Sequence, residues 1–411
     1  MAGPIFRFGK FPKQKLNERG RFSNHGWRHG SGTARLGIVV CVRGVGVLSQ
    51  ADDFPIHQNP EPIAYAGVSR NFYDRYFFNG YHLNEDVFFA LGMGIYPQLD
   101  VIDAGFSLII DGVQHNLLCS RVLNHERMQT QVGDITVDVI TPLQCLRIVI
   151  DSAQHELKAD LLFTGRAPAQ EEPRFTRRIG TQTVMDYTRL TQNGCWQGFI
   201  EFRGRRINVS PECWLGTRDR SWGIRPVGAA DPQKNPHAPT SNQFYWLWAP
   251  INWPDAVSLY HLNDDADGKP WNTAGVFLPL AGEAETMRSV SSKIDFISGT
   301  RHARMAQIKL HSFAGSNAEI IMRPRFHWYM KGVGYGHPEF AHGHYHGGAA
   351  QLFEEYPLDT VDDAMNLHIQ AICDVSMEGD FGTRQGKGVL EQLIVGPHAP
   401  SGFTQLLDMA P

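Results

Sequence analysis

The chain has 411 residues, of which 42% are hydrophobic and 19% charged, so its composition supports a packed core and argues against overall disorder. A net charge of −4 gives no support for a nucleic-acid-binding protein. No apolar run reaches the roughly 18 residues that a membrane helix needs, so we expect no stable membrane insertion. The length predicts two or three domains.

The six cysteines are widely scattered and include no C-x-x-C pair, which argues against a zinc site and against a dense disulfide framework. We therefore expect free thiols and a cytoplasmic protein. Secretion is the less favoured alternative, because the apolar run 36–48 is short, contains Arg43 and is followed by a poor cleavage site.

Residues 1–50 carry nine Lys or Arg against one acidic residue, Glu18, and show neither helical nor strand periodicity. We predict a disordered extension over 1–50. A basic arm that binds an anionic surface is the alternative interpretation.

From residue 52 onward, short strand-like runs alternate with turn residues, which is the pattern of an all-β sandwich or barrel. Asn79-Gly80, Asp111-Gly112, Asn193-Gly194 and Arg203-Gly204 are predicted turns. The polar, Pro-containing loop 229–241 divides the rhythm into two halves. We predict one β-domain over 51–235, a second over 236–411, and few helices.

The segment 71–81 holds six aromatic residues around one Asp–Arg pair. In a strand, Tyr73 and Arg75 face one side while Asp74 and Tyr76 face the other. The segment is either an aromatic-rich sheet surface or the wall of a binding pocket, and in the second case Tyr73, Asp74 and Arg75 are substrate-binding candidates.

The segment 216–228 is the most unusual stretch of the chain, because it combines charge, aromatic character and glycine. In a strand, Arg218 and Arg220 point one way, and Asp219 points the other together with Ser221. Pro226 ends the pairing, since it has no amide donor and restrains Arg225. The cluster is either an Arg–Asp network that ties down a strand end or a site with Asp219 as general acid or base.

Two further segments contain candidate site residues. Trp246 and Trp248 share one face of the aromatic strand 244–253, whose other face is also apolar, so this strand is buried between two layers or lines a cavity.

In 327–348, His342, His344 and His346 alternate, but the glycines around them favour a loop, and we expect no metal there. A neutral histidine such as His337 is better suited to proton transfer.

The block 216–226, followed by Phe244-Tyr245-Trp246-Leu247-Trp248, resembles the tandem-lipocalin superfamily, which groups AttH-like proteins with the hydroxyneurosporene synthase (carotenoid 1,2-hydratase) family. The block 330–338, with His342-Gly343, looks like the matching segment of bacterial relatives. The resemblance covers roughly residues 52–400. Residue by residue, Asp219, Trp222 and Arg225 match the first motif, and Tyr335, His337 and His342 match the second.

The resemblance implies two packed lipocalin-like β-domains with a hydrophobic pocket, and an activity that needs no cofactor. We hypothesise a lyase, hydratase, isomerase or cyclase for a terpenoid- or polyketide-like molecule. Asp219, His337 and Tyr335 are its catalytic candidates. Tyr73, Asp74, Arg75, Trp222, Arg225, Trp246, Trp248 and His342 are its substrate-binding candidates, and a tryptophan would face a developing cation. A non-catalytic carrier and a module whose aromatics are all core are the alternatives. A homodimer is left open.

Overall fold

The structure, a computed structural model, describes residues 68–124, 126–230 and 243–411. The predictions for residues 1–50, for most of the loop 229–241 and for both domain boundaries fall outside these ranges. Across the described residues, the only helical segments are short 3-10 turns. None of these turns has the length and apolar character that crossing a membrane requires.

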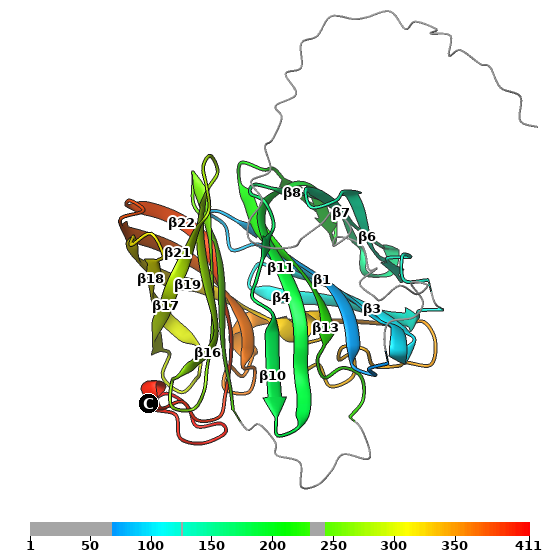
Figure 1. Ribbon diagram of the computed structural model, residues 1–411. Coiled ribbons are helices and arrows are strands. Elements are labelled where there is room, and N and C mark those ends of the chain that lie inside the picture. Colours follow the sequence, from blue (N-terminus) through cyan, green and yellow to red (C-terminus); the bar gives the residue numbers. More distant parts are fainter. Residues whose placement is uncertain (1–67, 125, 231–242) are drawn as a thin grey trace, which may run out of the picture. The chain divides into compact units, whose positions relative to one another are not determined.

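The described chain is built almost entirely from antiparallel strands, as the sequence predicts (Figure 1). The first half forms strands β1 (Phe72–His82), β2 (Phe88–Tyr96), β3 (Val101–Ile110), β4 (Val113–Val122), β5 (Gln131–Val132), β6 (Ile135–Thr141), β7 (Cys145–Ser152), β8 (Leu157–Gly165), β9 (Gln170–Glu171), β10 (Phe175–Ile179), β11 (Gln182–Phe202), β12 (Arg205–Val209) and β13 (Trp214–Ile224).

The second half forms strands β14 (Phe244–Asn252), β15 (Ala256–Asp264), β16 (Pro270–Pro279), β17 (Glu285–Phe296), β18 (Ala303–Ser312), β19 (Asn317–Tyr329), β20 (Ala350–Pro357), β21 (His368–Gly379) and β22 (Arg384–Val395). The 3-10 turns η4 (Met330–Val333) and η5 (Leu358–Thr360) lie between β19 and β21.

Two sheets contain these strands. One has 14 strands and runs β20-β4-β3-β2-β1-β13-β11-β8-β7-β6-β5, with β9, β10 and β12 paired to β11. The other is a closed barrel of β14 to β19 with β21 and β22. Strand β20 comes from the second half of the chain but pairs with β4 of the first sheet. The barrel and the large antiparallel sheet confirm the predicted all-β class.

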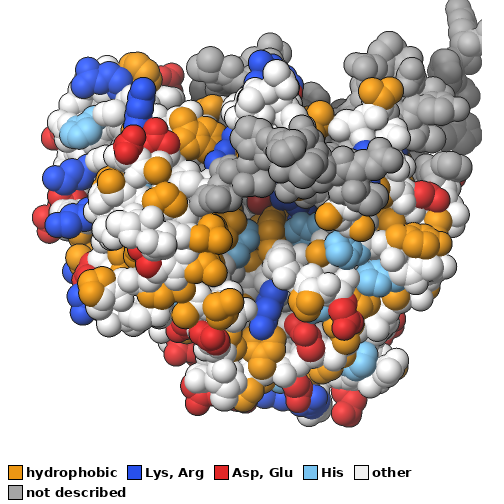
Figure 2. Space-filling model, turned by 90° about the horizontal axis from the view of Figure 1, so that it is seen from below, with side chains coloured by type: hydrophobic (Ala, Val, Ile, Leu, Met, Phe, Trp, Pro, Cys, Tyr) orange, Lys and Arg blue, Asp and Glu red, His pale blue; other side chains and the backbone are white. Residues whose placement is uncertain are grey.

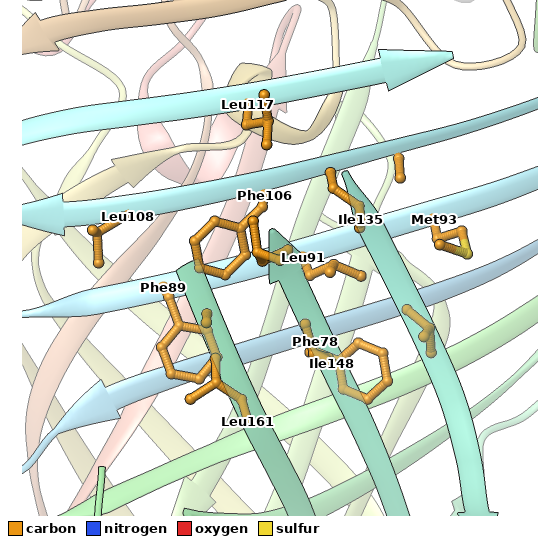
Figure 3. Close-up of a cluster of buried hydrophobic side chains, with 14 of the residues drawn as sticks. Phe78, Phe89, Leu91, Met93, Phe106, Leu108, Leu117, Ile135, Ile148 and Leu161 are labelled. Atoms are coloured by element: carbon orange, nitrogen blue, oxygen red, sulfur yellow. The ribbon is translucent and has the colours of Figure 1, made fainter. Parts of the chain in front are cut away.

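Each sheet encloses an apolar core. Inside the large sheet, side chains of β1, β2 and β3 pack against those of β6, β7 and β8 (Figure 3). The barrel has its own interior core, which includes Leu247 and Ile251 of β14. A third cluster fills the layer between the sheet and the outer face of the barrel, and Trp246 and Trp248 belong to it. Strand β14 is therefore buried on both faces, as its sequence indicates.

Two of the predicted turns are wrong. Asn79-Gly80 lies inside β1, and Asn193-Gly194 lies inside the single long strand β11. Gly80 and Gly194 both stand opposite Gly216 of β13. A Cβ on Gly80 would lie 2.3 Å from the Phe89 ring, and one on Gly194 would lie 2.3 Å from the Phe163 ring. These glycines make room for aromatic rings. By contrast, Asp111-Gly112 and Arg203-Gly204 do form turns, with positive φ at each residue.

The described cysteines are Cys119, Cys145, Cys195, Cys213 and Cys373, and all five are free, as expected.

Candidate active site

The alternation of β13 separates its charged residues onto two faces of the large sheet. Asp219 is paired with Phe77 and Arg220 with Tyr76. Phe77 packs in the layer between sheet and barrel, whereas Tyr76 packs in the core on the opposite face. Asp219 therefore faces the barrel and Arg220 faces away from it, as the sequence predicts. The strand ends at Ile224, just before Arg225-Pro226.

The face opposite to Asp219 holds a buried ionic network. Arg220 is ion-paired with Asp74, and the Arg127 guanidinium lies 3.6 Å from the same carboxylate. Trp222 is paired with Asp74 and shares this face. Breaking such a buried pair by removing one partner costs about 3–5 kcal/mol. Asp74 and Trp222 thus lie outside the group of side chains around Asp219, in a position that supports the sheet.

Asp219 itself is partly accessible and lies among charged groups. Burial raises its pKa to about 7, the charges of Arg189 and Arg75 lower it, and those of Glu391 and Glu172 raise it. Among the described residues, no hydrogen bond or ion pair is made by its carboxyl group. A carboxyl group in this state is half protonated near pH 7 and can give up its proton.

The second carboxylate near Asp219, Glu172, is tightly held. It is ion-paired with Arg189, lies 3.0 Å from His261 Nδ1, and accepts hydrogen bonds from Thr191 Oγ1 at 2.5 Å and Trp248 Nε1 at 3.1 Å. Burial raises its pKa, but the charges of Arg189 and His261 outweigh burial and lower it below the ordinary range. Glu172 is therefore an anchored anion at neutral pH.

Arg189 carries a positive charge onto the aromatic wall. Its guanidinium carbon lies 4.8 Å from the centre of the Trp246 ring and 5.5 Å from that of Trp248. Both predicted tryptophans are thus in the layer that Asp219 faces, but both already contact a cation. A developing cation beside these rings would share them with the Arg189 guanidinium, whose charge is balanced by Glu172.

The third carboxylate, Glu391 of β22, is also anchored. Its Oε1 accepts from Trp246 Nε1 at 2.9 Å and lies 3.1 Å from His368 Nε2, and its Oε2 accepts from Gln370 Nε2 at 2.9 Å. Burial raises the pKa of Glu391, but these hydrogen bonds lower it overall. Because the carboxylate accepts, His368 carries a hydrogen on Nε2.

A cluster of arginines and tyrosines completes the site. Arg225 lies over the ring of Tyr73 at 4.4 Å and over that of Tyr335 at 5.5 Å, and Arg75 lies 5.1 Å from the Tyr335 ring. Burial raises the pKa of Tyr73 to about 12, and the charges of Arg225, Tyr335 and Asp219 all act on it. Tyr73 therefore connects the Arg225 cluster with Asp219.

His342 positions Arg225 and does not titrate near neutral pH. Its Nε2 lies 2.9 Å from the Val333 carbonyl oxygen, and its Nδ1 lies 3.0 Å from an Arg225 nitrogen. A carbonyl only accepts and a guanidinium only donates, so His342 has its hydrogen on Nε2 and is neutral. Burial, together with Arg75 and Arg225, keeps its pKa well below the usual value.

Arg75 is held in place by a small residue and by polar partners. It donates to the Val333 carbonyl oxygen at 3.0 Å and lies 3.8 Å from Asp103. A Cβ on Gly92 would lie 2.2 Å from an Arg75 nitrogen, so only glycine leaves room for this guanidinium. Asp103 also accepts from the Gly343 amide at 2.7 Å, which fixes the loop that contains His342.

His337 has a different place from the other catalytic candidates. Its Nδ1 accepts hydrogen bonds from the amides of Glu339 and Phe340 at 3.1 and 2.8 Å, and its Nε2 lies 3.4 Å from Glu354. Both ring nitrogens are thus engaged in organising the loop. His344 and His346 lie in the same irregular segment, and His346 stacks on Phe340. Several histidine side chains are visible on the face of the molecule seen in Figure 2.

The structure therefore brings together Asp219, Tyr335, Tyr73, Arg75, Arg225, Trp246, Trp248 and His342 from the predicted set. The sequence reasoning missed Glu172, Arg189, His261, His368 and Glu391. Glu391 had a detectable signal, because it is a lone acidic residue in the otherwise uncharged run 389–395. Glu172 had no such signal, because the stretch around it has the composition of a linker.

Fold and site together define an all-β protein with a polar, titratable layer between a large sheet and a closed barrel. Solved structures with a similar arrangement include a Nitrosomonas europaea protein assigned as AttH (12% identity, TM-score 0.49, covering 78% of this chain and 92% of that one). Kievitone hydratase from Nectria haematococca is similar at 11% identity and a TM-score of 0.41, covering 78% of this chain and 88% of that one. CghA with Sch210972 is similar at 10% identity and a TM-score of 0.47, covering 80% and 89%.

The first of these structures bears the name of the group that the motif at 216–226 resembles. With TM-scores below 0.5, the likenesses carry no inference about the chemistry of this chain. No curated protein matches it. The model of the family of unknown function DUF8625 matches residues 48–404, and the chain belongs to that family.

Proposed function

We propose that the protein is a proton-transfer enzyme, of the hydratase/lyase or isomerase type, for a hydrophobic small molecule that carries a carbonyl group. The observation that supports this most directly is Asp219, a partly accessible carboxyl group between two apolar layers with a pKa raised by burial to about 7. Such a group serves as a general acid at neutral pH.

Arg225 and Tyr335 provide a place for an oxyanion in the layer that Asp219 faces. Arg189 already contacts the rings of Trp246 and Trp248, so these rings are less available to a developing cation. Arg225 and Tyr335, by contrast, bring N–H and O–H donors to the same layer. Donors fixed before the reaction stabilise negative charge that develops on a carbonyl oxygen, with effects of about 3–4 kcal/mol for one donor.

His368 is the base in this proposal. Glu391 holds its Nε2–H at 3.1 Å, which orients the ring and leaves Nδ1 for the proton. The ring also packs edge-on against Tyr335, with centroids 4.7 Å apart. A histidine oriented by a carboxylate is a common arrangement for general base catalysis. His337, the base predicted from the sequence, is occupied by loop contacts instead.

The proposed step needs only these side chains. His368 removes a proton from the carbon beside the carbonyl, and negative charge moves onto the carbonyl oxygen near Arg225 and Tyr335. In an elimination, a hydroxyl group leaves from the adjacent carbon with the proton of Asp219, so that water and a carbon–carbon double bond form. Hydration is the reverse. In an isomerisation, Asp219 returns a proton to another carbon.

The test begins with extraction and mass spectrometry of any ligand that co-purifies. That ligand, or otherwise a panel of aromatic unsaturated ketones, is then incubated with the protein in D2O. We expect wild-type protein to incorporate deuterium at carbon. Asp219→Asn and His368→Gln should lower the rate by about 10²–10⁴-fold, while Asp359→Asn, which changes an exposed carboxylate, should not. Full exchange in Asp219→Asn would refute the proposal. A bound ligand that never exchanges or changes would favour the carrier alternative.

A further inference from the structure

A second group of titratable side chains lies in the barrel, apart from the residues around Asp219. It consists of His302, just before β18, His327 in β19, and Asp363, between η5 and β21. One potential ligand atom from each lies within 4.8 Å of the others, and within the described residues no other group of three His, Cys, Asp or Glu meets this criterion. Three sequence segments therefore converge on one point.

A β-bulge explains why a histidine points there. Before the bulge between Pro324 and Phe326, Ile320 and Met322 of β19 belong to the interior core of the barrel. After it, Phe326 and Trp328 pack in the layer outside the barrel. His327 is then paired with Ala371, an interior residue. The extra residue thus turns His327 inward, among apolar neighbours, where a polar group needs a partner.

His302 places its Nδ1 close to the Asp363 carboxylate. The side chain is fully buried, with 0% of its surface exposed. Its Nε2 lies 2.9 Å from the Asn366 carbonyl oxygen, so Nε2 carries a hydrogen and donates it to that carbonyl. Within the described structure Nδ1 has no hydrogen-bond partner, and it lies 3.5 Å from Asp363 Oδ1. A cation between Nδ1 and the carboxylate would bind to both of these atoms.

The other two members suit a cation as well. The His327 ring packs edge-on against His302 with centroids 4.9 Å apart. His327 brings a second imidazole to within ligand distance of the other two groups. Asp363 accepts a hydrogen bond from the Tyr329 hydroxyl. Two neutral imidazoles and one carboxylate are a frequent ligand set for zinc.

One ligand–ligand separation agrees with tetrahedral geometry. Ligand atoms about 2.0–2.1 Å from a zinc ion at the tetrahedral angle are about 3.4 Å apart, and the measured separation of His302 Nδ1 and Asp363 Oδ1 is 3.5 Å. The proposed ligands are held by hydrogen bonds of the kind that orient metal ligands in proteins. The Asn366 carbonyl oxygen accepts from His302 Nε2, and the Tyr329 hydroxyl donates to the Asp363 carboxylate.

We propose that His302, His327 and Asp363 bind a divalent transition metal ion of the zinc type, with a fourth coordination position open to water. The ion links the segment between η5 and β21 to the barrel. Tyr329 directly precedes η4, and His368 begins β21. The metal therefore stiffens the two segments that lead to Tyr335 and His368. This proposal replaces the expectation of a metal-free protein that the sequence alone supports.

The test uses the full chain after treatment with a chelator and titration with Co²⁺. We expect one equivalent of Co²⁺ to bind with the visible absorption of a tetrahedral site, Zn²⁺ to displace it, and Zn²⁺ to raise the Tm. His327→Gln and Asp363→Asn should abolish the absorption. The matched control, His344→Gln with His346→Gln, removes histidines of the loop run and should leave it unchanged.

Absence of stoichiometric binding, or loss of the absorption in the loop control but not in His327→Gln, would overturn the proposal. If the site variants fail to fold, X-ray absorption of Zn²⁺-loaded wild-type protein decides. Two imidazoles with oxygen ligands would support the site. A thiolate, a third imidazole or an all-oxygen shell would refute it.

Discussion

Replacing Asp219 by Asn should stabilise the protein at high pH, although most substitutions of buried residues destabilise. Asn keeps the size of the side chain but cannot ionise. The folded protein holds the Asp219 proton up to a pKa of about 7, whereas the unfolded chain releases it near 3.9. Between these values the folded state binds more protons, so stability falls as pH rises.

The magnitude follows from the two pKa values. Each pH unit between them is worth about 1.4 kcal/mol, so the full penalty above pH 7 is at most about 4 kcal/mol. Because Asp219 is partly accessible to water, screening reduces this figure, and we expect Asp219→Asn to gain about 2–4 kcal/mol at pH 8. The gain should shrink on acidification and vanish below about pH 4, where both states of the wild type are protonated.

Urea denaturation at pH 8, 6 and 4.5, followed by tryptophan fluorescence and circular dichroism, measures this difference. Asp359→Asn, at an exposed position, is the matched control and should change stability by less than about 0.5 kcal/mol at each pH. If Asp219→Asn were less stable than wild type at pH 8, or if the difference did not depend on pH, the carboxyl would be ionised in the folded state. That result would also refute the proposed role of Asp219 as a general acid.

Two further substitutions test the packing and the anchored ion pair. Gly80→Ala places a methyl group 2.3 Å from the Phe89 ring and should lower the free energy of unfolding, measured by urea denaturation, by about 1–3 kcal/mol. Gly348→Ala is the control and should leave stability unchanged, because no atom lies within 4 Å of the added methyl group. Equal loss of stability in both variants would contradict the role given to Gly80. Glu172→Gln leaves Arg189 without its carboxylate and should cost about 3–5 kcal/mol and alter tryptophan emission, because Arg189 contacts Trp246 and Trp248. Glu378→Gln, at an exposed strand position, is its control, and a similar loss in both variants would refute the assignment.

The sequence predicts the faces of individual strands well, because side-chain alternation is a local property. It places Asp219 and Arg220 on opposite faces, and burial between two layers is one of its two interpretations of β14. Its errors also have local causes. Asn79-Gly80 is typical of a hairpin turn, but Gly80 is required by an aromatic ring from the next strand, Phe89, and one sequence does not show which ring will lie over which glycine.

The partners of the site could not be predicted because they converge from distant segments. Asp219 is influenced by Glu172 and by Glu391, which is 172 positions further along the chain. His327 reaches the barrel interior only through a bulge at Pro324/Phe326. Strict alternation along β19 would place His327 outside the barrel. Because the bulge shifts the register by one residue, periodicity alone cannot predict that this histidine points inward.

The contrast among three carboxyl groups in one layer explains why Asp219 is the residue that can transfer a proton. Glu172 is surrounded by Arg189, His261, Thr191 and Trp248, and Glu391 by His368, Gln370 and Trp246; both pKa values lie below the ordinary range. Burial, with a smaller contribution from these two fixed negative charges, then raises the pKa of the third group, Asp219, which has no such donors within the described structure. Environments that push the pKa values of neighbouring groups apart are typical of acid–base sites. The hydrogen bonds that hold Glu172 and Glu391 as anions are therefore part of what keeps Asp219 protonated, and loosening either one should lower the pKa of Asp219.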